Sequence, residues 1–424
     1  MGTLVLISLI LLPGLTLTLL VCRSQSEDWW DRWRNVIWAM PVPAGFLVVS
    51  ICMEILEYFH LLSVANLVTG SALITFVSVI PLFVGGCRVT GLMAEFRKLN
   101  PVKVMIPIAI IGVYMCLTVY PFSFIFDSMD SGVYITSGVN AFRNGSFRYH
   151  DSEIAHSSRE FRESLLYLTP HESYSSARKF HFEGYMGMGH SIRSLDTGLV
   201  EPRYFNLHPF WIGLFVELFG LEPGVWLATP FVAMCGMMGL FILAFALSGW
   251  MGSVLSLSFA SLFVLQVWLG RYITTEMTVQ AAVLNGMAWL LIFGRKRNHL
   301  PLFLAGLFIG ISHFARIDTV LIIPAFLGSM YIWLCFLEKP LDKAGFALGY
   351  FVALIPAVHM AATRFHCYTL ETLQHVNISQ LSVRWLSAGL CVLACIMLLI
   401  APIRKYRLII VQLLQPWERA LWIT

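Results

Sequence analysis

The sequence predicts an all-α polytopic membrane protein with about eleven membrane-spanning helices and one large polar loop. Three observations support this fold class. Hydrophobic residues make up 58% of the 424 positions and charged residues only 12%, whereas soluble domains carry about a quarter charged residues. The mean hydropathy is +0.75. Apolar stretches of roughly 18 residues or more, long enough to cross about 30 Å of hydrocarbon, recur along the chain.

Each predicted span is an apolar stretch bounded by charged or turn-forming residues. We place the spans at residues 3–22, 36–56, 67–86, 103–121, 225–247, 252–270, 278–294, 300–315, 318–337, 344–363 and 385–402. The first stretch resembles a signal peptide, but it has neither a basic start nor a clear cleavage site of small residues. We therefore expect it to be a retained helix.

The basic residues predict the orientation in the membrane. With these spans, all basic clusters fall on one side, which the positive-inside rule assigns to the cytoplasm. The clusters are Arg23/Arg32/Arg34, Arg88/Arg97/Lys98, Arg295/Lys296/Arg297, Lys339/Lys343 and Arg404/Lys405/Arg407. The sequence thus predicts a multi-pass protein of the plasma (inner) membrane, with its N-terminus outside and its C-terminus in the cytoplasm.

The apolar segment from His208 to Gly220 is a special case, because it is shorter than the roughly 20 residues that a span requires. Counting it as a crossing would place the basic cluster 295–297 outside. We therefore expect an interfacial helix that lies along the outer membrane face, with Trp211 and the phenylalanines facing lipid.

The loop 122–208 differs in composition from the rest of the chain. It carries 18 of the 52 charged residues and six of the twelve histidines. Its tyrosines indicate an ordered segment, and a loop of this length in a compact protein is usually functional or disordered. On the predicted topology it is extracytoplasmic.

Two carboxylates at the start of this loop are candidate general bases. Asp127 and Asp130 are three residues apart just after the fourth predicted span, so they share one face if the segment is helical. A partly desolvated carboxylate at this position suits proton abstraction from a hydroxyl group. The alternative is a solvated helix cap or an interfacial charge.

Two further charged segments are predicted on the same side of the membrane. Arg271 and Glu276 lie between two predicted spans, and Arg316 lies at the end of another. Ionisable groups at such depths are costly and often serve ion, proton or phosphate chemistry, and an arginine can clamp a phosphate. The alternative is a helix-end charge that extends its head group to water.

Metal and nucleic-acid sites are not predicted. The loop histidines show no HxH or HxxxH spacing, and the nine cysteines include no CxxC pair. No cofactor is expected, although a divalent metal ion is left open. The net charge of +4 is too small and too scattered to indicate nucleic-acid binding.

Four segments resemble one family in their order along the chain. They are DSMDSGVYITSGVNAFRNGSF, NLHPFWIGLFVELFGLEPGVWLATPFVAMCGMMGLFILAF, RYITTEM and LAGLFIGISHFARIDTVLIIPAFL. They resemble, respectively, the first outer loop, the juxtamembrane helix with its following span, the second outer loop and a later helix pair of GT-C glycosyltransferases. Relatives of this kind include protein O-mannosyltransferases and aminoarabinose transferases. In the first segment an Asp is followed four residues later by a Tyr, here Asp130 and Tyr134.

The resemblance extends from about residue 103 to residue 363 and implies three parts. These are an N-terminal three-helix addition (1–100), a GT-C-like catalytic core (101–365) and a C-terminal loop, last span and cytoplasmic tail (366–424). The sequence departs from the family where Ser131 stands for a Glu and Phe210 for a second proline. The core also begins at the fourth predicted span rather than at the first.

The resemblance implies an inverting transfer of a sugar from a polyprenyl-phosphate carrier to a lipid, glycan or protein acceptor outside the cytoplasm. Asp130 would be the general base, with Asp127 as its competitor. The substrate-binding residues would be Tyr134, His208, Arg271, Glu276 and Arg316. Two other functions stay open from the residues, namely a polysaccharide polymerase or ligase and a membrane transporter.

Overall fold

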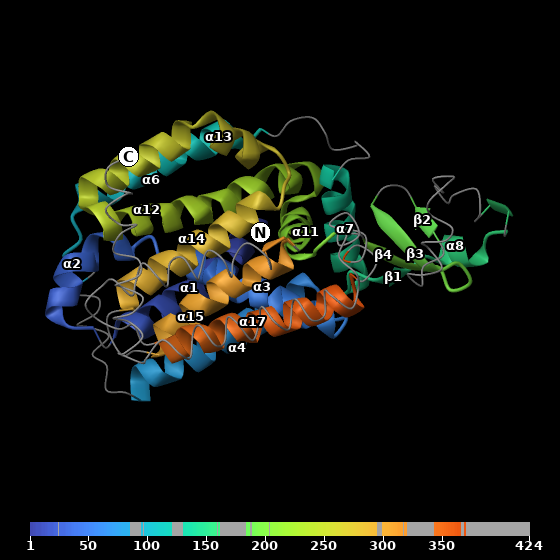
Figure 1. Cartoon of the computed structure of the whole chain (residues 1–424), viewed down its shortest axis with the longest axis horizontal. Coiled ribbons are helices and arrows are strands. Elements are labelled where there is room, and N and C mark those ends of the chain that lie inside the picture. Colours follow the sequence, from blue (N-terminus) through green and yellow to red (C-terminus); the bar gives the residue numbers. More distant parts are fainter. Residues whose placement is uncertain are drawn as a thin grey trace, which may run out of the picture.

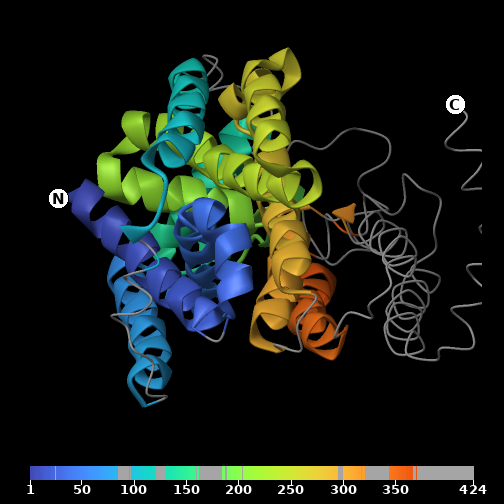
Figure 2. The same ribbon diagram turned by 90° about the vertical axis from the view of Figure 1, so that its left-hand side faces the viewer.

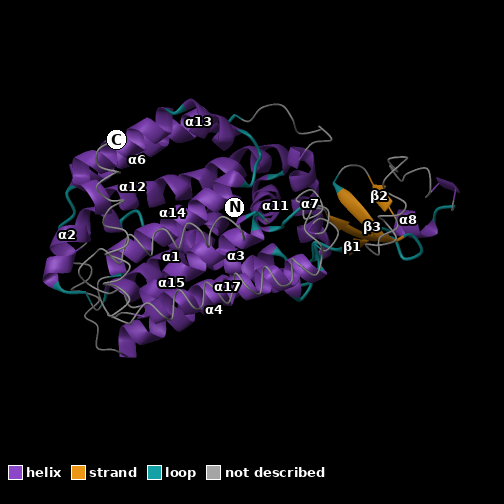
Figure 3. Cartoon of the chain, in the orientation of Figure 1, coloured by secondary structure: helices purple, strands orange, loops and turns teal. Residues whose placement is uncertain are grey.

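The structure is a computed structural model of the chain. It describes residues 1–23, 25–84, 95, 97–120, 130–158, 160–161, 184–186, 189–202, 204–294, 299–316, 318–319, 343–365 and 369. Helices pack lengthwise into one bundle, and a small sheet lies at one end (Figure 1). We call this end the loop end. In Figure 3 all the strands that are drawn lie there, together with the short helix α8.

The bundle consists of long and short apolar helices together with one short amphipathic helix, α2. Their bounds are α1 Gly2–Cys22, α2 Glu27–Ile37, α3 Pro41–Tyr58, α4 Val64–Val84, α6 Pro101–Thr118, α12 Leu221–Leu262, α13 Val264–Arg271, α14 Glu276–Phe293, α15 His299–Ile311, the 3₁₀ turn η1 Ser312–Phe314 and α17 Lys343–Thr363. The loop end carries α7 Asp130–Asn144, β1 Tyr149–His150, α8 Ser152–His156, β2 Gly184–Met186, β3 His190–Ser194, β4 Leu199–Pro202 and α11 Leu207–Phe219.

Within the described residues, seven helices are long and apolar enough to cross a membrane. They are α1, α3, α4, α6, α12, α14 and α17. Leu73 and Phe76 on α4 and Val113 on α6 are exposed, as expected of helices that face lipid rather than water. The chain therefore has the helices of a multi-pass integral membrane protein.

The prediction of about eleven spans is wrong for the part of the chain that the structure describes. The predicted spans 225–247 and 252–270 fall on either side of Gly249 (φ 71°, ψ −165°), where α12 consists of two helices joined across a kink, and α13 follows the second of them. The predicted span 300–315 becomes α15, whose 13 residues rise only about 20 Å. The predicted span 385–402, and 318–337 apart from its first two residues, lie outside the described residues.

Contacts between elements show in which direction α14 and α15 run. Near the start of α14, the Ile273 carbonyl accepts a hydrogen bond from Ser131 Oγ of α7, at 3.4 Å. At the other end of α14, the Ile292 carbonyl accepts one from Trp29 Nε1 of α2, at 3.4 Å. Thus α14 runs from the loop end to the opposite end, where α2 lies, and we call this the α2 end. The chain returns in α15, because Arg316 after it forms an ion pair with Glu276.

One hydrophobic core joins the N-terminal helices to the rest of the bundle. Trp29 of α2 stacks on Phe293 of α14, with ring centroids 5.4 Å apart. Figure 2 shows the blue helices α1 and α4 on one side of the bundle and the orange helices α15 and α17 on the other. The described helices of residues 1–84 therefore share one hydrophobic core with the later helices.

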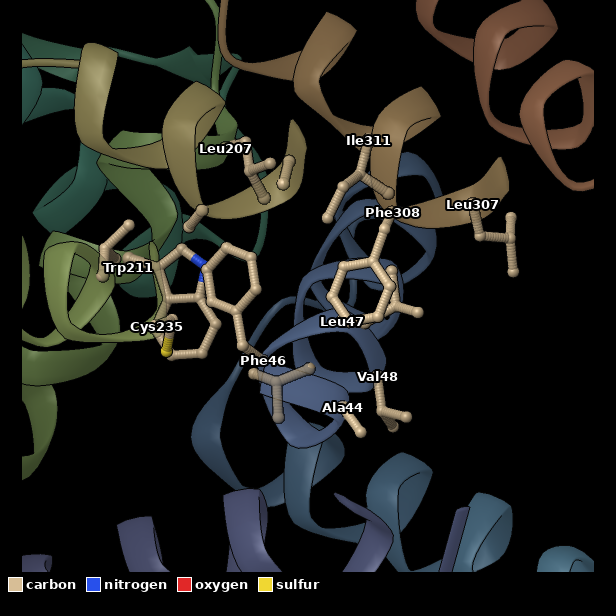
Figure 4. Packing of buried hydrophobic residues seen from close by; sticks show 14 of the residues in the cluster. Ala44, Phe46, Leu47, Val48, Leu207, Trp211, Cys235, Leu307, Phe308 and Ile311 are labelled. Carbon is tan, nitrogen blue, oxygen red and sulfur yellow. The ribbon is translucent and has the colours of Figure 1, made fainter. Parts of the chain in front are cut away.

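The helix α11 is buried inside the protein, and the expectation that its aromatic side chains face lipid is wrong. Trp211 is fully buried and stacks on Phe46 of α3 at a centroid distance of 5.0 Å (Figure 4). Its Nε1 donates a hydrogen bond to Ser50 Oγ at 3.1 Å. An interfacial helix needs a polar face, whereas α11 is apolar on nearly all sides and so packs best in a core. Figure 1 shows it almost end-on, crosswise to the lengthwise helices.

The loop end also corrects the all-α prediction. A four-stranded antiparallel sheet in the order β1-β4-β3-β2 forms there, over a small cluster of Ile154, Ile192 and Val200. The turn between β3 and β4 contains Gly198 with φ +63°, a left-handed conformation that glycine adopts without strain. The strands are two to five residues long, and such short elements leave little periodic signal in a sequence.

The orientation of the bundle can be tested with single cysteines. Asp31 is exposed at the α2 end, and Glu160 is exposed in the polar region at the loop end. We expect a membrane-impermeant thiol reagent added to intact cells to label a Glu160→Cys variant, and to label Asp31→Cys only after permeabilisation. Labelling of both variants in intact cells would contradict the predicted topology.

Candidate functional site

The first candidate residue, Asp130, is the first residue of α7. A carboxylate in the first helical turn is favoured by the helix dipole, and Arg143 in the last turn complements the other end. Asp130 is exposed rather than partly desolvated, and its Oδ1 accepts a hydrogen bond from the Tyr204 hydroxyl at 2.6 Å. This bond fixes one oxygen of an otherwise exposed carboxylate. Asp127 lies outside the described residues.

Aromatic rings link Asp130 to the buried helix α11. The Tyr134 ring lies edge-on to that of Tyr204, with centroids 5.3 Å apart, and edge-on to that of His208 at 6.1 Å. Tyr134 is buried one helical turn after Asp130, so the two residues share one face of α7. Tyr134 and His208, predicted from separate segments, thus meet in the structure.

His208 is a buried, fully hydrogen-bonded side chain. Its Nδ1 lies 2.8 Å from Thr278 Oγ1 of α14, and its Nε2 lies 3.3 Å from Thr229 Oγ1 of α12. Burial lowers the pKa of His208 to about 3, so the ring is neutral at neutral pH. A neutral imidazole donates from one nitrogen and accepts at the other, and the two threonine hydroxyls can serve both. His208 therefore joins α11, α12 and α14 beneath Tyr134.

Arg316 is held between two carboxylates. Its Nε and Nη2 each donate to one Asp318 oxygen at 2.9 Å, and its Nη1 donates to Glu276 Oε1. Burial lowers the pKa of Arg316, but the hydrogen bond to Asp318 and the charges of Glu276 and Asp318 raise it more, so the net shift is upward.

Arg271 occupies a different edge of the site. Its Nε donates to the Tyr120 carbonyl oxygen at 2.6 Å, which ties the end of α13 to the segment after α6. The following residues 272–275 pass next to α7 through the Ser131–Ile273 hydrogen bond. The structure thus connects Asp130, Tyr134, His208, Glu276 and Arg316 through successive contacts, and places Arg271 at the rim of the group.

Tyr204 was not found from the sequence. It lies 74 residues from its partner Asp130, so local spacing gives no signal for the contact. Thr229 and Thr278 were missed for a similar reason, because a threonine in an apolar helix is common and only the position of His208 gives it a role. The sequence feature that could have singled out Tyr204 is its position just before the apolar segment that forms α11.

A second ionic cluster ties the sheet to the bundle. Glu201 of β4 is buried, and its Oε2 lies 2.9 Å from Arg148 Nη2 and 3.3 Å from Arg193 Nε. Burial raises the pKa of Glu201 to about 7, although the two arginines act in the opposite direction. Arg148 also donates to the Thr363 carbonyl oxygen at the end of α17, at 2.7 Å. The cluster holds the polar region in place above the bundle.

The described residues contain no group of three or more His, Cys, Asp or Glu side chains that could hold a metal ion. The site consists instead of an exposed carboxylate with a phenol donor, a neutral buried imidazole, and arginines at the loop end. The carboxylate can accept a proton from a hydroxyl group, and the arginines can face an anionic substrate. Comparison with known proteins gives no further guide, since no protein-family model, curated protein or solved structure matches this chain.

Proposed function

We propose that the chain is a membrane glycosyltransferase that moves a sugar from a polyprenyl-phosphate carrier to an acceptor hydroxyl outside the cytoplasm. The observation that carries the proposal is Asp130, an exposed carboxylate at the start of α7 that Tyr204 fixes at the loop end of a membrane bundle. The resemblance of four segments to GT-C glycosyltransferases gives this carboxylate its reaction. The loop end would face outward, as the positive-inside rule predicts.

In the proposed reaction, the Asp130 carboxylate accepts the proton of the acceptor hydroxyl. The acceptor oxygen then forms a bond to the anomeric carbon of the sugar, and the bond from that carbon to the phosphate oxygen breaks. The polyprenyl phosphate leaves as an anion. Arg316 is paired with Glu276 in the site, and Arg271 lies at the rim of the site. Hydrogen-bond donors that face the charge developing on the leaving phosphate usually make the largest catalytic contribution.

The two arginines are not equivalent in this role. Arg316 already faces Glu276 and Asp318, so an incoming phosphate would have to share it with carboxylates or displace one of them. Its side chain is 36% exposed, and ion pairs this open to solvent are weak enough to rearrange on binding. A phosphate would thus exchange with a carboxylate rather than find an empty guanidinium.

The proposal is tested by comparing cells with and without the protein. We expect mass spectrometry of extracted lipids to show a polyprenyl-phosphate sugar that accumulates when the protein is removed, and mass spectrometry of glycans to show the loss of one sugar. The purified protein in liposomes should restore transfer from that carrier. Unchanged lipids and glycans in the deleted strain would contradict the proposal.

A transporter is the second candidate, because one polar group lies among the membrane helices. Gln266 of α13 and Gln280 of α14 exchange two hydrogen bonds, at 2.9 and 3.0 Å, and Gln266 Nε2 lies 3.4 Å from the Tyr114 hydroxyl. The chain is also non-helical at Phe263 (φ −68°, ψ 120°), between α12 and α13. Transporters often place their binding sites at such broken helices. Solute uptake by reconstituted liposomes without sugar transfer would favour this function.

A further inference from the structure

Two buried polar side chains connect the N-terminal helices to the start of α11. Asn206, the residue before α11, donates a hydrogen bond from Nδ2 to Glu54 Oε2 of α3 at 2.8 Å. Asn206 is fully buried and Glu54 is 7% exposed. The remaining polar atom of each side chain, Glu54 Oε1 and Asn206 Oδ1, is buried and has no hydrogen-bond partner among the described residues. Such unpaired buried atoms are rare in folded proteins and call for an explanation.

The charges around Glu54 do not balance if it is ionised. Glu57, one turn further along α3, is fully buried and forms an ion pair with Arg364. Glu57 Oε1 also accepts from Ser146 Oγ at 3.2 Å and from the Phe147 amide at 3.4 Å. Arg364 is already engaged by Glu57, and it also donates to the Tyr58 carbonyl oxygen at 2.8 Å. Two neighbouring buried carboxylates with one guanidinium leave a net negative charge, which proteins usually neutralise with a proton.

We infer that Glu54 is a protonated carboxylic acid that forms a ring of two hydrogen bonds with Asn206. The Asn206 amide donates from Nδ2 to Glu54 Oε2, as the structure shows. The acid proton on Glu54 Oε1 donates to Asn206 Oδ1, so both unpaired oxygens are satisfied at once. The pair is then neutral, and Glu57 keeps Arg364 to itself. The Glu54–Asn206 pair thus holds one proton, on Glu54 Oε1.

The position of the pair gives the proton a structural role. Asn206 stands two residues before His208, whose ring contacts Tyr134 in the candidate site. One turn before Glu54, Ser50 accepts the hydrogen bond of Trp211, and Phe46 stacks on the same indole (Figure 4). The protonated pair thus fixes the first turn of α11 to α3, and it gives the N-terminal helices a direct connection to the site. This inference does not depend on the proposed reaction.

Matched glutamine variants of the two carboxylates test it in the full-length protein. In Glu54→Gln the new amide donates to Asn206 Oδ1 and accepts from Nδ2, so the ring is preserved and the Tm should stay close to that of the wild type. In Glu57→Gln, Arg364 loses its carboxylate while its side chain stays only 13% exposed, so the Tm should fall clearly. If Glu54→Gln lowers the Tm as much as Glu57→Gln does, Glu54 is ionised and the inference is wrong.

Infrared spectroscopy gives a second test that needs no Glu57 variant. A protonated carboxylic acid has a C=O stretching band above the amide I band, and this band shifts in D₂O. We expect the wild type to show a band of this kind that Glu54→Gln removes. A spectrum in which the substitution removes no acid band would overturn the inference, as would a Tm that depends on sodium at constant ionic strength in the wild type but not in Glu54→Gln.

Discussion

Replacement of Asp130 by asparagine should reduce the rate of sugar transfer about 10²–10⁴-fold, the usual contribution of a general base. The amide keeps the shape of the carboxylate but cannot accept the proton of the acceptor hydroxyl. The side-chain oxygen of the asparagine can still accept the Tyr204 hydrogen bond, so the start of α7 should keep its position. The measurement is the transfer rate of the purified protein with a saturating polyprenyl-phosphate sugar, together with its Tm.

Two control variants separate chemistry from position. Tyr204→Phe removes the hydrogen bond that orients Asp130 but leaves the carboxylate, so it should lower the rate by less than Asp130→Asn. Asp127→Asn should also have the smaller effect, because the resemblance places a Tyr four residues after the catalytic Asp, and this Tyr follows Asp130 and not Asp127. A dead Asp127 variant beside an active Asp130 variant would transfer the assignment to Asp127. If both variants retain their activity, neither of these two carboxylates is the base.

The bundle could be predicted from the sequence where each helix is both long and apolar. The helices α1, α3, α4, α6, α14 and α17 lie within a few residues of their predicted spans, because a membrane imposes a minimum length that hydropathy reveals. Length also explains why the predicted span 300–315 fails at α15, which has only 13 residues. This helix ends in a 3₁₀ turn, where Ser312 Oγ donates a hydrogen bond to the Ile309 carbonyl oxygen at 2.6 Å. Such a local ending has no hydropathy signal.

The candidate site was harder to predict because its contacts join distant segments. The charged residues Asp130, Glu276 and Arg316 were selected since ionisable groups stand out in an apolar chain. Tyr204, the partner of Asp130, is an ordinary residue whose role depends on a contact 74 positions away. Asn206 likewise has its role only through Glu54, 152 positions away. The burial of α11 likewise depends on α3 and α7, which its own sequence does not specify.

The position of Asp130 and His208 relative to each other depends on how closely α7 and α11 approach. The two helices cross at a pair of glycines, where no side chain separates the backbones. A Cβ atom added to Gly138 would lie 2.1 Å from the Pro209 carbonyl oxygen, and one added to Gly213 would lie 2.4 Å from the Gly138 carbonyl oxygen. Both neighbours are backbone atoms, so they cannot turn aside as a flexible side chain would.

The variant Gly138→Val should therefore force α7 away from α11 and weaken both folding and transfer. Overpacking of this kind costs about 1–3 kcal/mol, and a clash with backbone belongs at or above the upper end. The matched control is Gly112→Val in α6, where nothing lies within 4 Å of the added Cβ, so its Tm should stay near that of the wild type. We expect Gly138→Val to lower the Tm clearly and to reduce transfer even below that Tm, because Asp130 and Tyr134 move with α7. Equal stability and equal activity of the two variants would show that the close crossing does not set the geometry of the site.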